Sequence, residues 1–117
     1  MSDECIFCHI IQGKAPARIV YQDDEVTAFW DITPRTPVHL LVVPNTHIDS
    51  LEALNEKDGR LLGQMILTAR RLAGEHGIGE SGYRLVINTG ADAGQTVLHL
   101  HLHLIGGRRM PVFFPLP

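Results

Sequence analysis

The sequence has no long apolar run, only a small net charge and just two cysteines. No stretch approaches the roughly 20 consecutive apolar residues of a membrane span, so no membrane partner is expected. A net charge of −3 gives no general attraction to nucleic acid or to an anionic membrane. The acidic start, Met1 to Glu4, lacks a signal-peptide pattern, which predicts a cytoplasmic protein whose thiols stay reduced.

The length and composition predict one compact domain over residues 1–117. An apolar fraction of 44% and a charged fraction of 20% are typical of an ordinary globular chain with one core. Neither an internal repeat nor a linker interrupts the chain.

Helical and strand patterns alternate along the sequence. The predicted helices are a short one at Ile6–Gln12, one or two turns at Ser50–Leu54 and a long one between Asn55 and Gly77. The predicted strands are Ile19–Tyr21, Val26–Trp30, Val38–Val43, Tyr83–Asn88 and Leu98–Ile105. This order predicts an α+β domain with a mainly antiparallel sheet of about five strands.

The long helix carries the clearest local signals. Asn55 is a good N-cap, Asp58 completes a weak capping box, and Gly77 ends the helix. One predicted apolar stripe comprises Leu61, Leu62, Met65, Ile66, Ala69, Leu72 and Ala73.

Three alternating histidines occupy the last predicted strand. His99, His101 and His103 share one face because alternate side chains of a strand point the same way. Leu98, Leu100, Leu102 and Leu104 occupy the other face, which is the core face. Three adjacent imidazoles do not suit an apolar interior, because each would need its own polar partners.

Three interpretations of this face compete: a polar surface, a metal cluster and a catalytic site. Spacing alone does not separate metal binding from catalysis, since His-x-His is also a common zinc pairing. The preceding loop, Gly94–Thr96, offers backbone N–H groups, an amide and a hydroxyl, the donors that a phosphate needs. A neutral imidazole beside such donors favours nucleophilic attack on phosphorus.

The pattern His-φ-His-φ-His-φ-φ, with φ apolar, is met by His99–Ile105. With Phe29–Ile32, Pro37–His39, Asn88–Gly90 and Gly106–Met110, it resembles the histidine triad (HIT) family. The combination is similar to the Hint-like branch, the purine nucleoside phosphoramidases. The resemblance implies a HIT-like fold whose sheet continues across a homodimer.

The resemblance also implies roles for individual residues. It makes His101 the nucleophile that forms a nucleotidyl-histidine, with its ring held by the carbonyl of His99. The implied phosphate contacts are His103 and Thr96, with Gly94, Gln95 and Asn88 beside them and His39 nearby. Asp31 would bind the ribose, and Ile6, Phe7, Ile10, Phe29 and Ile32 would form the purine pocket. The implied substrates are AMP–amine or GMP–amine compounds, and no cofactor is required for the chemistry.

Without the resemblance, several of these positions look ordinary. Asp31 is then a capping acid, and Ile6, Phe7 and Ile10 are the buried face of a short helix.

The pair Cys5-x-x-Cys8 allows three interpretations: a redox pair, two inert buried thiols or half of a zinc site. The chain resembles bacterial HIT proteins with this N-terminus, which bind structural zinc through two cysteines and two histidines. The matching histidines are His47 and His99.

Two other functions stay open at this point. One is a zinc hydrolase in which His99, His101 and His103 hold the metal. The other is a nucleotide-binding protein without turnover. The closing segment Pro111–Pro117, with Phe113 and Phe114, is expected to be buried against a partner.

Overall fold

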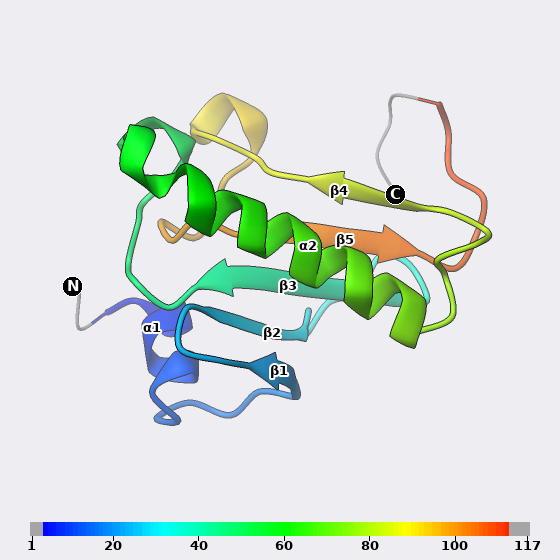
Figure 1. Ribbon diagram of the computed structural model, residues 1–117, viewed down its shortest axis with the longest axis horizontal. Coiled ribbons are helices and arrows are strands. Elements are labelled where there is room, and N and C mark those ends of the chain that lie inside the picture. The colour runs from blue at the N-terminus through cyan, green and yellow to red at the C-terminus, as the bar shows by residue number, and fades with distance from the viewer. Residues whose placement is uncertain (1–3, 113–117) are drawn as a thin grey trace.

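The computed structural model describes residues 4–112 and contains a five-stranded antiparallel sheet in the order β1-β2-β3-β5-β4 (Figure 1). The strands are β1 (Ile19–Gln22), β2 (Val26–Trp30), β3 (Val38–Pro44), β4 (Tyr83–Val86) and β5 (Leu102–Gly106). The helices are α1 (Ile6–Ile11) and α2 (Gly59–Glu75), with three short 3-10 turns at η1 (Leu51–Ala53), η2 (Glu56–Asp58) and η3 (Ala91–Ala93). The predicted α+β class with about five strands is confirmed.

Strand β3 is the centre of the sheet, and every one of its residues is buried. Its alternate side chains serve two separate apolar clusters. Leu40 and Val42 join the cluster that α2 covers, whereas Leu41 and Val43 join the cluster that α1 covers. The continuous apolar run in the sequence therefore reflects a strand covered on both faces.

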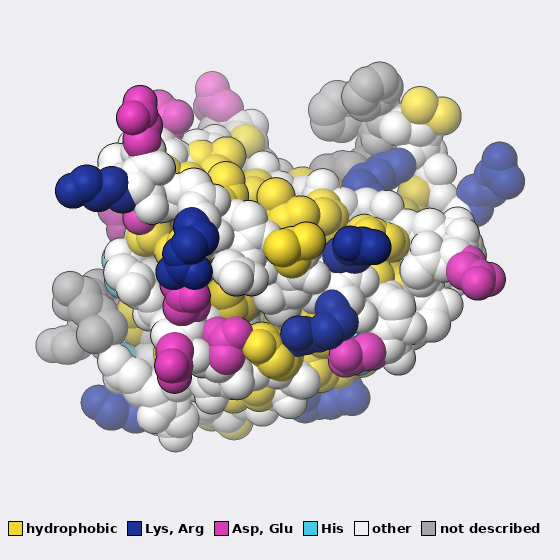
Figure 2. All heavy atoms as spheres, viewed as in Figure 1, with side chains coloured by type: hydrophobic (Ala, Val, Ile, Leu, Met, Phe, Trp, Pro, Cys, Tyr) yellow, Lys and Arg dark blue, Asp and Glu magenta, His cyan; other side chains and the backbone are white. Residues whose placement is uncertain are grey.

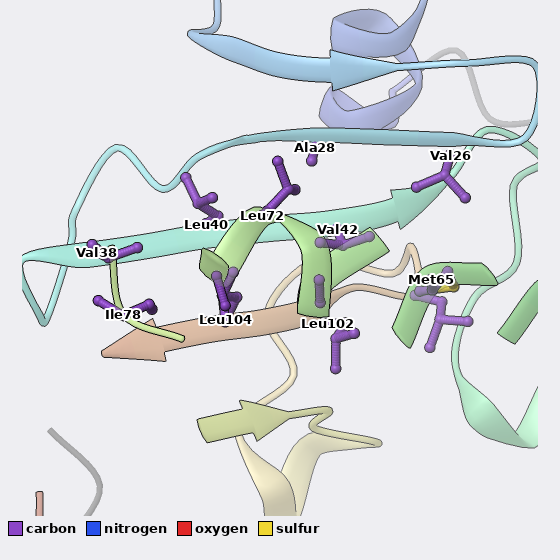
Figure 3. Close-up of a cluster of buried hydrophobic side chains, with 13 residues drawn as sticks. Val26, Ala28, Val38, Leu40, Val42, Met65, Leu72, Ile78, Leu102 and Leu104 are labelled. Atoms are coloured by element: carbon purple, nitrogen blue, oxygen red, sulfur yellow. The ribbon is translucent and has the colours of Figure 1, made fainter. Parts of the chain in front are cut away.

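The larger cluster lies between the sheet and α2 (Figure 3). Met65 and Leu72 of α2 are buried against side chains of β3 and β5, among them Leu102 and Leu104. The leucine face of the last strand is thus core, as expected, with one exception. Leu98 is 64% exposed, because it precedes β5.

Strand β5 begins at Leu102, four residues later than predicted. The reason is the end of its partner: the last β3–β5 pair is Val42 with Leu102. Beyond it the chain follows the loop after β3, where the Leu100 N–H donates to the carbonyl of Ile48 at 2.6 Å. Strand β4 likewise ends at Val86, two residues before the predicted end.

The capping box forms as predicted but caps a different element. Asn55 and Asp58 exchange hydrogen bonds around η2, and α2 begins only at Gly59. The helix ends before Gly77, whose φ of +78° suits glycine. Within the predicted apolar stripe, Ile66 is 43% exposed, which is a departure from the pattern.

Between residues 4 and 112, no helix is both long and apolar enough to cross a membrane. The expected burial of Phe113 and Phe114 against a partner falls outside the described residues.

Candidate active site and candidate metal centre

The histidines form a row on the sheet face that α1 covers. The rings of His101 and His103 lie 5.1 Å apart, and His39 of β3 continues the row 5.2 Å beyond His103. At the opposite end, the ring of His99 lies 4.9 Å from that of His47. Alternation along one extended segment, together with the β3–β5 register, produces this arrangement.

His101 is 7% exposed, and its protonation pattern is fixed by one hydrogen bond. Its Nδ1 lies 2.7 Å from the carbonyl oxygen of His99. A carbonyl only accepts, so Nδ1 carries the proton. In the neutral ring, Nε2 is then the nitrogen with the free electron pair, which is the arrangement a nucleophile needs.

A second chain of hydrogen bonds orients His103. The Arg35 backbone N–H donates to Nδ1 of His39 at 3.1 Å, so the proton of neutral His39 sits on Nε2. That Nε2 donates to Nδ1 of His103 at 2.9 Å and also lies 3.4 Å from Oδ2 of Asp31. The remaining nitrogen of His103, Nε2, is therefore an N–H donor.

Burial keeps this pair uncharged at neutral pH. Burial, reinforced by the neighbouring His101 and His39, lowers the pKa of His103 to about 4. Burial also lowers the pKa of His39, against the opposing effect of the Asp31 carboxylate. At pH 7 both rings are therefore uncharged.

A cavity of about 710 Å³ opens beside these rings, a size that suits a nucleotide-sized ligand. Its apolar wall includes all five side chains expected there: Ile6, Phe7, Ile10, Phe29 and Ile32. Its polar lining includes Asp31, His39, Asn88, Gly94, Thr96, His101 and His103. Residues from six separate segments of the sequence meet in this one space.

Two of the residues predicted for catalysis or nucleotide binding, Gln95 and His99, do not line the cavity. Gln95 is used inside its own loop: its side chain accepts from the Gly90 N–H at 2.9 Å and donates to the Asp49 carbonyl at 2.7 Å. These bonds hold the loop together, and a place for Gln95 beside the phosphate stays a prediction. His99 faces the cysteines instead.

The sequence analysis missed Arg35, which also lines the cavity. Its positive charge lowers the pKa of both His39 and His103. Within residues 4–112 its guanidinium has no hydrogen-bond or ion-pair partner. The available signal was its place as the one basic residue in the loop between Trp30 and Val38.

The second cluster joins Cys5 and Cys8 at the start of α1 to His47 and His99, and all four ligand atoms lie within 4.8 Å of one another. Nδ1 of His99 lies 3.3 Å from Sγ of Cys5 and 3.6 Å from Sγ of Cys8. Nδ1 of His47 lies 3.3 Å from Sγ of Cys8. A tetrahedral zinc ion would place such sulfur and nitrogen atoms about 3.6 Å apart.

The outer nitrogens of these two histidines also fit metal binding. Nε2 of His47 lies 2.8 Å from Oδ1 of Asp49, and Nε2 of His99 lies 2.8 Å from the Pro44 carbonyl. With Nε2 donating outward, each Nδ1 turns a free electron pair toward the thiols. Without a cation, burial and the bond with Cys5 raise the pKa of Cys8 to about 11. The donor set therefore suits a divalent ion that holds the sulfurs as thiolates.

Asp31, His39 and His103 also lie close enough to hold a metal, but their hydrogen bonds oppose it. Nδ1 of His39 faces an N–H donor, so its proton sits on the nitrogen that would have to bind the ion. His99, His101 and His103 do not converge on one point either, because His99 turns to Cys5 and Cys8. The geometry thus disfavours a catalytic metal held by the histidine row.

A family model described as HIT domain matches residues 12–110. The chain belongs to the HIT family. It is 47% identical to the purine nucleoside phosphoramidase of Escherichia coli K12, over 92% of this chain and 91% of that protein. The solved structure of a HIT family hydrolase from Clostridium thermocellum is 42% identical, with a TM-score of 0.95 over 98% of this chain and all of that one.

A third relative bears on the cysteine cluster. A zinc-bound HIT family protein from Mycobacterium smegmatis is 36% identical, with a TM-score of 0.78 over 90% of this chain and 76% of that one. Together these matches confirm the family resemblance and the fold, and they make the chain an enzyme, a hydrolase of the HIT family. The pair Cys5 and Cys8 opens its first helix as expected.

Proposed function

We propose that the enzyme hydrolyses purine nucleoside 5′-phosphoramidates, such as AMP–amine or GMP–amine compounds, through a covalent intermediate on His101. The observation that carries the proposal is the His101 ring at the cavity wall, with Nδ1–H held by the His99 carbonyl and Nε2 unprotonated. The 47% identity to a purine nucleoside phosphoramidase supports the substrate class.

In the first step, Nε2 of His101 attacks the α-phosphorus, the bond from phosphorus to the amine breaks, and the amine leaves with a proton. In the second step, water attacks the same phosphorus and the bond to His101 breaks, which releases the nucleoside monophosphate. The His103 N–H, the Thr96 hydroxyl, the Asn88 amide and the Gly94 backbone stabilise the charge on the phosphate oxygens.

The rest of the nucleotide fits the remaining lining. The carboxylate of Asp31 binds the ribose hydroxyls, and its Oδ1 is fixed by the Thr33 N–H at 2.8 Å. The purine lies against Ile6, Phe7 and Phe29, with Ile32 at the rim, where it is 94% exposed. A flat apolar base would cover this side chain and remove it from water.

The proposed ion at Cys5, Cys8, His47 and His99 is zinc, in a structural role. The four ligands complete a tetrahedral shell and leave no position for substrate. The chemistry at phosphorus therefore needs no metal.

The proposed assembly is a homodimer formed through α2 and the outer edge of β4. Ile66 and Leu67 of α2 are 43% and 55% exposed, and β4 is an edge strand of the sheet. Apolar side chains gather over α2 and toward β4 on this face, among scattered charges (Figure 2). A cytoplasmic location, expected from the sequence, completes the proposal.

The deciding experiment is turnover of adenosine 5′-phosphoramidate in excess EDTA by the native protein and by His101→Asn. We expect the native protein to turn over and the variant to lose about three orders of magnitude or more in kcat. Circular dichroism verifies that both proteins stay folded, and calorimetry with AMP verifies that both still bind the product.

Two results would overturn the proposal. Activity that is lost completely with the chelator in a folded protein, returns with zinc, and is retained by zinc-loaded His101→Asn would establish metal-activated water as the nucleophile. AMP binding without turnover by either protein would establish a nucleotide-binding protein.

A further inference from the structure

We propose that the Cys5–Cys8–His47–His99 cluster positions the nucleophile, so that metal occupancy changes the rate of phosphoryl transfer more than it changes nucleotide affinity. The inference rests on the proposed function of His101. It assigns the cluster a part in catalysis, which a purely structural ion would not have. Two separate contacts connect the cluster to the His101 ring.

The first contact is through the backbone of His99. This residue is fully buried, and its side chain is held between the two thiols on one side and the Pro44 carbonyl on the other. The same residue supplies the carbonyl that holds Nδ1–H of His101. A displacement of the His99 ring therefore moves the hydrogen-bond acceptor that decides which nitrogen of His101 is free.

A neighbouring backbone bond reinforces this contact. The Leu100 N–H donates to the carbonyl of Ile48, so the residues following His99 and His47 are also joined. An ion held by both histidines would fix the two segments to each other at adjacent positions. Without it, the connections are this backbone hydrogen bond, the contact between the two rings and the weak contacts of both rings with Sγ of Cys8.

The second contact is through Phe7, which lies between the two cysteines in the sequence. Its ring meets the ring of His101 edge-on, with centroids 5.2 Å apart and an angle of 87°. It also meets the rings of His99 at 5.9 Å and Phe29 at 5.3 Å. Phe7 thus forms the wall against which the nucleophile is oriented.

The helix that carries Phe7 depends on outside support. α1 has only six residues, well below the length at which a helix is stable by itself in water. Its first turn holds Cys5 as the N-cap and Cys8, so an ion bound to both thiols would fix this turn against the sheet. Ile6, Phe7 and Ile10 of this helix also line the cavity, so loss of the ion lowers nucleotide affinity as well. The contacts of Asp31, Asn88 and Thr96 come from other segments, which keeps the loss of affinity smaller than the loss of kcat.

The test compares zinc-loaded and zinc-free native protein with His47→Asn, which removes one ligand and its ring contact with His99 while Phe7 and His99 themselves are unchanged. His9→Asn is the matched control, because His9 lies on α1 outside the cluster. Four readouts are needed: zinc content by elemental analysis, the ¹⁵N signals of the His101 imidazole, the Kd for AMP and the kcat for adenosine 5′-phosphoramidate.

We expect zinc removal and His47→Asn to lower kcat by roughly 10- to 100-fold, the cost of a small misplacement of a reacting group. The Kd for AMP should rise by a smaller factor than kcat falls, and the ¹⁵N signals should change from one tautomer to a mixture. His9→Asn should match the loaded native protein in all four readouts.

Several results would overturn the proposal: a protein that binds no metal, a folded zinc-free protein with unchanged kcat and imidazole signals, or equal losses in kcat and affinity. If zinc removal unfolds the chain, Asp49→Ala is used in place of zinc removal, because loss of the carboxylate that accepts from His47 weakens metal binding about 10- to 100-fold. The kcat and the His101 tautomer signal of this variant should then vary with zinc occupancy while the folded fraction stays constant. If kcat and the tautomer signal do not vary with zinc occupancy, the proposal is contradicted. If the loaded protein has no turnover at all, the proposed function fails, while the ¹⁵N signals still decide whether the cluster controls His101.

Discussion

At the scale of single residues, the site works through protons that are fixed in place. The carbonyl of His99 and the backbone N–H of Arg35 each decide which nitrogen of a neighbouring ring is protonated. His101 is thereby left with a free electron pair, and His103 with an N–H. Backbone groups are well suited to this because they do not titrate and do not rotate away.

The low pKa of His103 predicts a loss of stability in acid. The unfolded chain takes up this proton near pH 6.5, whereas the folded chain resists it until about pH 4. The His103 contribution is complete above pH 6.5 and is lost as the pH falls toward 4. In His103→Asn, where the amide oxygen still accepts from His39, the free energy of unfolding should fall less steeply over this range.

Urea denaturation at half-unit steps from pH 7 to pH 4 measures this difference. At each pH, the unfolding free energy of the variant is subtracted from that of the native protein. This subtraction cancels losses of stability that both proteins share, such as release of a bound metal. Parallel curves for the two proteins would show that His103 is not protected from protonation.

The exposed side chain of Ile32 gives a prediction about substrate affinity. Ile32→Ser should raise KM for adenosine 5′-phosphoramidate about three- to tenfold and leave kcat unchanged, because the base covers part of an apolar side chain. Ile19→Ser is the control, since Ile19 is also exposed but lies on β1, outside the cavity lining. Steady-state kinetics that show equal effects of both changes would place the base elsewhere.

At the scale of elements, the central strand β3 and helix α2 hold the catalytic face in position. One side of β3 contributes Leu40 and Val42 to the core under α2, while the other side presents His39 and Leu41 to the cavity. A substitution in the contact between α2 and the sheet should therefore lower the stability of the fold. It can alter the cavity only by displacing the sheet.

Leu72→Ala tests how strongly this packing stabilises the fold. Leu72 is 1% exposed at the centre of the α2 contact with the sheet, so the variant should lose about 2–5 kcal/mol of unfolding free energy. Gln64→Ala, on the exposed side of the same helix, should stay within about 0.5 kcal/mol of the native protein. Similar losses in both, measured by urea denaturation with the metal saturated, would contradict the core assigned to α2.

At the scale of the whole molecule, the two faces of the sheet have different functions. The face under α1 holds the cavity and the metal ligands, and the face under α2 holds the main core. Among the described residues, the outer surface of α2 and the edge of β4 are the surfaces that we propose for assembly. An edge strand with unpaired backbone groups favours pairing with another chain.

The proposed dimer predicts a change of mass on adding charge to α2. By light scattering, the native protein should have twice the 13.0 kDa mass of one chain, and Leu67→Glu should shift toward one chain. Ile19→Glu, at the opposite edge of the sheet, should stay dimeric. Dissociation by the Ile19 change alone would place the interface at β1.

Much of the fold was determined by the sequence itself. The alternation in His99–Ile105, the doubly buried run Val38–Val43 and the stop at Gly77 follow from local periodicity and backbone sterics. The family was determined too, because the histidine pattern has a fixed spacing within one segment. These signals are local, because each depends only on residues that are close together in the sequence.

The tertiary structure decided where strands end and which side chains meet. The start of β5 depends on where β3 stops pairing, and the exposure of Ile66 depends on which side of α2 packs on the sheet, neither of which a local pattern contains. The side chain of Gln95 binds the Asp49 carbonyl and the Gly90 N–H, which are close only in the folded chain. Arg35 lines the cavity because its backbone N–H binds His39 and so holds its loop beside that strand. Contacts between distant segments carry no periodic signal, so only the packed chain determined them.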